Sequence, residues 1–309
     1  MGQYHHLIAG LPDITLEDSK QVYSVYSFKR EVNEMLSRKD RVLLSLFFLK
    51  YDNLNLLNRL ENRETEPDNR GTLSEEELNE LHSLIPENKK EYEQEYGFGQ
   101  KKISKKIPTY FIEFLKQYQE NPEQEDMEQE DNDSPEDLNI TKEDILSALY
   151  YKYAIKSGNR FISQWFEMNL NIKNILTAIT CKRHNLDKNL YIIGDNSVAK
   201  ALRTSNAKDY NLGDEIEYLP AVLKLAEESD LVMREKRIDI LKWDWLEYNT
   251  IFKVFGIESV FAYLLKIEMI ERWTGLDKAT GENTFRELIT TMKRESNSAL
   301  EEFKKNNKR

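Results

Sequence analysis

The sequence predicts an all-α protein of pseudo-repeated helical subdomains, and three observations support this fold class. First, Asn53–Asn58 reads Asn-Leu-Asn-Leu-Leu-Asn, and Asn169–Asn174 returns as Asn-Leu-Asn-Ile-Lys-Asn. Second, both copies lie within long apolar stretches with helical spacing, although asparagine is a poor helix former. Third, 11 glycines and 7 prolines in 309 residues favour long helices with few connections. The recurrence indicates duplication of a helical unit.

The first part of the chain is expected to begin extended and then to form four helices. Residues 1–14 are interpreted as extended, with a turn at 10–13. Apolar residues at helical spacing predict the elements that follow. Ser74 and Glu77 have the spacing of a capping box, and Pro108 suits the first position of a helix. The expected helices are Leu16 to about Leu36, Arg38 to Glu61, Ser74 to about Leu84, and Tyr110 to Tyr118.

The second part is also expected to be helical, with one candidate strand at Tyr191–Ile193 that could equally be a buried turn. Thr141 should cap a helical pattern that reaches His184 with a break at Gly158, and Asp230 should cap a later helix. The expected helices after Thr141 to His184 are Ser197 to Arg203, Glu215 to Glu227, Asp230 to Tyr248, Ile257 to Trp273, and Asn283 into the basic tail.

Charge is concentrated in one segment. The net charge is −11, and Glu120 to Asp137 contains ten acidic residues and no basic residue. This segment is predicted to be a solvated insertion, because like charges repel and almost nothing apolar is available for burial. The acidic balance argues against nucleic-acid binding, which needs clustered Lys and Arg. The single cysteine, the lack of a signal-peptide pattern and the short apolar runs predict a cytoplasmic protein without direct membrane insertion.

The repeated asparagines are interpreted as structural brackets rather than as a binding face. On a helix Asn55 and Asn58 share a face, as do Asn171 and Asn174, whereas Asn53 and Asn169 point elsewhere. A buried amide must find partners for two donors and one acceptor. At least one asparagine of each copy is therefore expected to tie its helix to a neighbouring helix end or loop.

The repeated segments resemble the C-type (in eukaryotic complexes, d-type) component of the V/A-type rotary ATPases. The similar stretches are Tyr51-Asp52-Asn53-Leu54-Asn55-Leu56-Leu57 and Phe166–Ile172, with a weaker third echo at Tyr263–Trp273. Met168 stands where the first copy has Asp52, and Glu271 and Arg272 stand where the third copy should have asparagine. The opening, Tyr4 to Asp13, resembles an uncharacterised Bacteroidetes family whose genes tend to lie among those for V-type ATPase subunits.

The resemblance implies three related helical subdomains and a non-catalytic function. The C-type component is a socket in the central stalk, between the rotor shaft and the membrane proteolipid ring. It implies shaft subunits and the proteolipid ring as partners, a position peripheral to the inner membrane through them, and no cofactor. A helical protein–protein adaptor unrelated to ATPases is the alternative, and an enzyme using carboxylates on a helical bundle is a second one. The expected division is 1–119, an acidic insertion at 120–138, 139–228 and 229–309.

Catalytic, cofactor and metal sites are not predicted. Adjacent His5 and His6 in an extended segment would face opposite sides, and Cys181 with His184 offers two of the four ligands of a structural zinc site. No phosphate-binding glycine motif or nucleophile elbow is present in the sequence. Trp243 and Trp245 should lie on different sides of a helix. One of these two is expected in the core and the other, with Trp273, is a possible partner contact.

Overall fold

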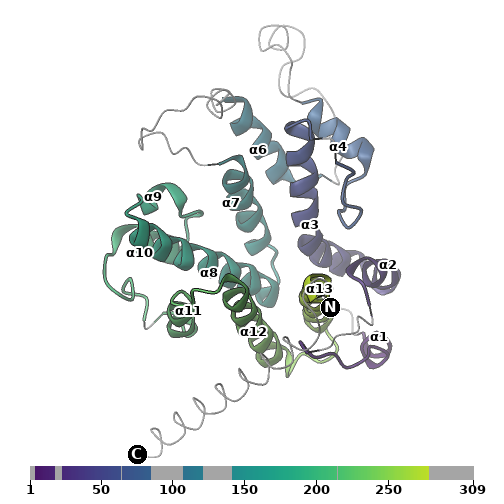
Figure 1. Cartoon of the computed structure of the whole chain (residues 1–309). Coiled ribbons are helices and arrows are strands. Elements are labelled where there is room, and N and C mark those ends of the chain that lie inside the picture. The colour runs from purple at the N-terminus through teal and green to yellow at the C-terminus, as the bar shows by residue number, and fades with distance from the viewer. Residues whose placement is uncertain are drawn as a thin grey trace, which may run out of the picture. The chain divides into compact units, whose positions relative to one another are not determined.

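The computed structural model describes residues 4–17, 23–63, 65–84, 107–120, 141–213 and 215–277 of the chain (Figure 1). These residues form twelve helices and no strand, which confirms the predicted all-α class. The candidate strand at 191–193 is instead a buried turn. Tyr191 ends the short helix α9 (Lys188–Tyr191), and Ile192 and Ile193 are buried directly after it.

The chain divides into two compact units. Unit 1 contains residues 1–40 and 239–309, and unit 2 contains residues 41–238. The first predicted subdomain, 1–119, therefore contributes to both units, because its N-terminal part packs with the C-terminal helices. The predicted acidic insertion lies outside the described residues except at Glu120, and so does the helix expected from Asn283. The boundaries of three repeated subdomains stay a prediction.

Unit 1 contains α1 (His5–Ala9), α2 (Val25–Met35), the start of α3 (Arg38–Leu60), the end of α12 (Leu231–Thr250) and α13 (Ile257–Asp277). The expectation of an extended N-terminus is wrong, since residues 5–9 form a helical turn that buries Leu7. Helix α2 begins later than expected because Ser24 caps it: the Ser27 amide donates to Ser24 Oγ over 3.0 Å.

The core of unit 1 lies where α2 packs against α13. Both helices place apolar residues at helical spacing on the shared face, and these side chains are almost completely buried. They include Val25, Phe28, Val32, Val260, Phe261 and Leu264. Burial of this kind stabilises a unit by roughly 1.5–3 kcal/mol for each large apolar side chain.

Unit 2 is organised around α8 (Arg160–His184). Helices α7 (Lys142–Ile155), α9, α10 (Ser197–Thr204) and α11 (Leu219–Leu225) all contact it, as Figure 1 shows. Helix α6 (Thr109–Glu120) packs on α7, and α4 (Glu75–His82) packs on α6. A central position explains why apolar side chains surround α8 rather than forming one stripe.

Local signals in the sequence set most helix ends of unit 2. The Ser74–Glu77 capping box is present in both directions, and Thr141 caps α7 as predicted. The break between α7 and α8 falls at Gly158, whose φ of 76° lies in the left-handed region that glycine tolerates. Asn159 then caps α8 by accepting from the amide of Ile162. The predicted cap at Asp230 is also present, with Oδ1 accepting from Val232 and Met233.

Candidate functional site

The first candidate site is a pair of side chains on α3 that holds the segment leading into α4. Asp52 is completely buried, and its carboxylate accepts from the Thr72 amide at 2.7 Å, the Leu73 amide at 2.9 Å and Thr72 Oγ1 at 2.7 Å. One turn later, Asn55 Nδ2 donates to the Asp68 carbonyl over 3.0 Å, and the Asp68 amide donates back to Asn55 Oδ1 over 2.7 Å. We call Asp52 and Asn55 the first bracket pair.

The first bracket pair requires a close backbone approach at Gly71. A Cβ added at Gly71 would lie 2.4 Å from Asp52 Oδ1 and 3.1 Å from Asn55 Nδ2. Glycine is therefore needed at this position because the segment passes directly over both polar side chains. The two side chains and the glycine together fix the path of the segment from α3 to α4.

A second pair with the same spacing lies on α8. Asn174 is completely buried, donates from Nδ2 to the Ile193 carbonyl over 2.8 Å, and accepts from the Ile193 amide over 3.1 Å. One turn earlier, Asn171 Oδ1 accepts from Asn196 Nδ2 at 2.8 Å, and Asn196 caps α10. We call Asn171 and Asn174 the second bracket pair.

The two pairs act alike, but they correspond one helical turn away from the register of the sequence repeat. In each pair, the later residue is an asparagine that exchanges two hydrogen bonds with one loop residue, Asp68 or Ile193. The earlier residue binds a group at or next to the start of the following helix. Asp52 therefore matches Asn171, and Asn55 matches Asn174. The sequence repeat had paired Asn55 with Asn171, which corrects the equivalence although not the bracket interpretation.

The third long helix makes a related contact within unit 1. Glu271 Oε2 on α13 accepts from the Val25 amide, at the first residue of α2, over 2.7 Å. An acidic side chain at a helix N-terminus satisfies an otherwise unpaired amide and favours the helix dipole. Thus the acidic residue that replaces asparagine in the third echo also binds the beginning of a shorter helix.

The other asparagines of the predicted motif are less buried. Asn53 accepts from Tyr110 Oη over 2.6 Å, and Asn169 donates to the carbonyl of Trp165 in its own helix over 2.8 Å. Asn58 is partly exposed. The face predicted for Asn55 and Asn58 is therefore buried at Asn55 only, because α3 approaches the surface of unit 2 near its end.

The tryptophans divide differently from the expectation. Trp243 and Trp273 are 9% and 5% exposed, and Trp273 Nε1 donates to buried Asp239 over 2.7 Å. Trp245 is partly exposed. Trp243 and Trp273 thus belong to the core of unit 1, and a partner contact through a tryptophan stays a prediction that only Trp245 has the exposure to make.

The possible metal ligands of the sequence do not form a cluster in the described part of the chain. No group of three or more His, Cys, Asp or Glu side chains suited to a metal ion occurs there. Cys181 is buried, which raises the pKa of its thiol, and His184 is exposed three residues later. Among the same described residues, no helix has the length and apolar character needed to cross a bilayer.

The second bracket pair predicts a stability change at high pH. Asn171 Nδ2 donates to Tyr218 Oη over 3.0 Å, and burial raises the pKa of Tyr218 to about 12. An unfolded tyrosine ionises near pH 10. The contribution of Tyr218 to the free energy of unfolding is therefore present below pH 10 and is lost as pH rises towards 12. Urea unfolding across this range should show a smaller loss in Tyr218→Phe than in the wild type.

Tyr248→Phe is the matched control for the Tyr218 experiment, because Tyr248 is 78% exposed. Its hydroxyl should ionise similarly in the folded and unfolded chain, so that its removal leaves the pH dependence unchanged. An equal loss of stability in wild type and Tyr218→Phe would contradict the assignment.

A family model matches residues 1–296, and its description is protein of unknown function (DUF2764). The chain belongs to this family. No curated protein and no solved structure matches it. For this DUF2764 member, the bracket pairs are therefore established by their own geometry. Their loop partners, Asp68 and Ile193, had no signal in the sequence, whereas the Asn196 cap could have been found from its place before the Ser197 helix.

Proposed function

We propose that this DUF2764 chain is a non-catalytic central-stalk component of a V/A-type rotary ATPase, coupling the rotor shaft to the proteolipid ring. The observation that carries the proposal is the matched use of Asp52–Asn55 and Asn171–Asn174, each tying a long helix to the start of the next short helix. Paired brackets of this kind support the repeated helical subdomains that the resemblance to the C-type component implies.

The brackets also suit a mechanical role. A protein that transmits torque must keep its helices in place under load, and two-point hydrogen bonds between a side chain and one loop residue restrict both rotation and sliding. Buried hydrogen bonds also resist opening because each separated group loses its partner without reaching water. The Glu271 contact to α2 extends the same device to unit 1.

Affinity capture tests the proposal. A tagged chain expressed in its native host should co-purify with the shaft subunits and the proteolipid ring of the rotary ATPase after mild detergent extraction. A tagged soluble protein of similar charge is the control. Membrane vesicles from a deletion strain should lose ATP-driven ion pumping and regain it when the chain is supplied. Capture of unrelated proteins together with unchanged pumping would contradict the stalk role.

A protein–protein adaptor unrelated to ATPases is the second candidate, and one observation favours it. Large apolar side chains are exposed at the end of α12 and directly after it, including Tyr248 at 78%, Ile251 at 62% and Phe252 at 93%. Exposed apolar clusters of this size are typical of surfaces that bind partners. The capture experiment separates the two candidates, because an adaptor would retain its partners in a strain that lacks the ATPase genes.

A further inference from the structure

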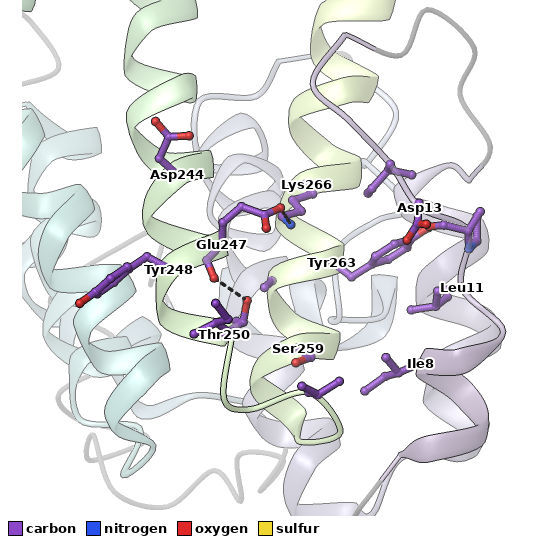
Figure 2. A pocket seen from close by; sticks show the side chains of 15 residues that line it. Ile8, Leu11, Asp13, Asp244, Glu247, Tyr248, Thr250, Ser259, Tyr263 and Lys266 are labelled. Carbon is purple, nitrogen blue, oxygen red and sulfur yellow. Dashed lines mark hydrogen bonds and ion pairs between the residues drawn. The ribbon is translucent and has the colours of Figure 1, made fainter. Parts of the chain in front are cut away.

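A groove in unit 1 is formed entirely by segments at the two ends of its sequence. It has a volume of about 630 Å³ and lies between α1 with the segment after it and the junction of α12 and α13 (Figure 2). Ile8 and Leu11 contribute apolar surface from one side, and Ile251 and Val254 contribute it from the other. This volume is in the range that accommodates several side chains of a ligand.

The groove is acidic. Asp13, Asp244 and Glu247 line it against one cation, Lys266, which pairs with Glu247 as Figure 2 shows. Three carboxylates and one ammonium leave a formal charge of −2. Partial burial and then the nearby Glu247 carboxylate raise the pKa of Asp244. A second cation brought beside Asp244 would relieve this repulsion, whereas a further anion would increase it.

The acidic and apolar groups follow one face of α12. Asp244, Glu247, Tyr248 and Ile251 have the spacing i, i+3, i+4 and i+7, which places carboxylates at one end of the face and apolar side chains at the other. Ile251 and Phe252 continue the exposed apolar surface beyond the helix end.

The apolar end of this face is held by hydrogen bonds. The Lys253 amide donates to the Thr250 carbonyl over 2.8 Å, and Ser259 Oγ donates to the Lys253 carbonyl over 2.6 Å. The Tyr4 amide donates to the Phe255 carbonyl over 2.8 Å. The exposed side chains are therefore presented by a backbone that is already ordered, which lowers the entropy cost of binding a partner.

We propose that this groove docks a basic amphipathic helix of a partner protein. The apolar stripe of that helix would cover Ile251 and Val254, and a Lys or Arg one to two turns away would lie beside Asp244. Apolar contact would supply most of the binding and the charge pair would select orientation and partner. The inference is independent of the proposed stalk function.

Charge selects this occupant over two others. The anionic surface of a lipid bilayer would be repelled by Asp13, Asp244 and Glu247, since membrane-binding surfaces carry Lys and Arg at such positions. A second copy of this chain would bring the same carboxylates against one another. A cationic helix instead meets opposite charge and apolar surface in the order in which α12 presents them.

Fluorescence anisotropy with labelled peptides tests the docking. The probe is a synthetic amphipathic helix of Leu and Lys, compared with a Leu and Glu helix of the same pattern and with a Ser and Lys peptide of the same charge. The full chain should bind the first probe alone, and more weakly as salt concentration rises. Asp244→Lys and Ile251→Ser should each weaken binding about three- to tenfold.

Glu227→Lys is the matched control for charge reversal, because Glu227 is an exposed acidic residue in unit 2. Its affinity for the Leu and Lys probe should stay within about twofold of the wild type. Thermal unfolding of each variant excludes misfolding as the cause. Equal binding of the probe by Asp244→Lys, Ile251→Ser and the wild type, no binding at all, or binding to anionic lipid vesicles in place of the probe would overturn the proposal.

Discussion

Asn174→Ala should lower the free energy of unfolding by about 3 kcal/mol, the largest effect expected for a single side chain of the bracket pairs. Asn174 is 0% exposed and Ile193 is 4% exposed, so water has no access to the groups that the substitution leaves behind. The Ile193 amide and carbonyl would both lose their partner. Each buried polar group without a partner costs about 1–3 kcal/mol. Urea unfolding followed by circular dichroism measures the change.

Two further variants separate hydrogen bonding from packing at this position. Asn174→Asp keeps the size of the side chain but cannot donate to the Ile193 carbonyl, so it should destabilise the chain at least as much as alanine does. Asn169→Ala is the matched control from the same motif, because Asn169 is partly exposed and donates within its own helix. It should change stability by less than about 0.5 kcal/mol. Similar losses in Asn169→Ala and Asn174→Ala would show that the bracket has no special contribution.

Asp52→Ala should destabilise the chain by about 2–3 kcal/mol, slightly less than Asn174→Ala. The carboxylate of Asp52 is completely buried and accepts from two backbone amides and one hydroxyl. Hydrogen bonds to a charged acceptor are worth about twice those between neutral groups. Thr72 is exposed, however, and its donors can reach water after the substitution, which limits the loss.

The Asp52 effect should also be local. Hydrogen exchange of the amides at Thr72 and Leu73 should accelerate strongly in Asp52→Ala, while amides in α8 change little, because only the segment before α4 loses its acceptor. Asp52→Asn, which keeps the shape and one acceptor oxygen, should give an intermediate effect. Asn58→Ala on the same helix is the control, and a loss there as large as that of Asp52→Ala would contradict the assignment.

Short-range patterns in the sequence were sufficient for the fold class and for many helix ends. The capping box at Ser74, the caps at Thr141 and Asp230, and the break at Gly158 depend on residues only a few positions apart, and all are present in the structure. The N-terminal expectation was wrong for a matching reason. Leu7 is buried in unit 1, and a helical turn at 5–9 forms with tertiary packing rather than from its own length.

The candidate sites were only partly visible. The asparagines of the repeat could be identified as brackets, because a poor helix former inside an apolar helix requires a reason. Which asparagine of each copy acts could not be read, since residues at i and i+3 share one face and the loop decides which of them it reaches. The acidic groove was not visible either, because residues 8–14 and 244–266 meet only after folding.

By itself, the sequence determined an all-α chain with a recurring asparagine motif and a set of capped helices, because helical periodicity and capping act over a few residues. Tertiary structure alone decided that Asp52 corresponds to Asn171 and Asn55 to Asn174, and that the two ends of the chain share unit 1. Both depend on the position of distant backbone groups, such as the amide and carbonyl of Ile193, whose identity as partners leaves no trace in the residues that bind them.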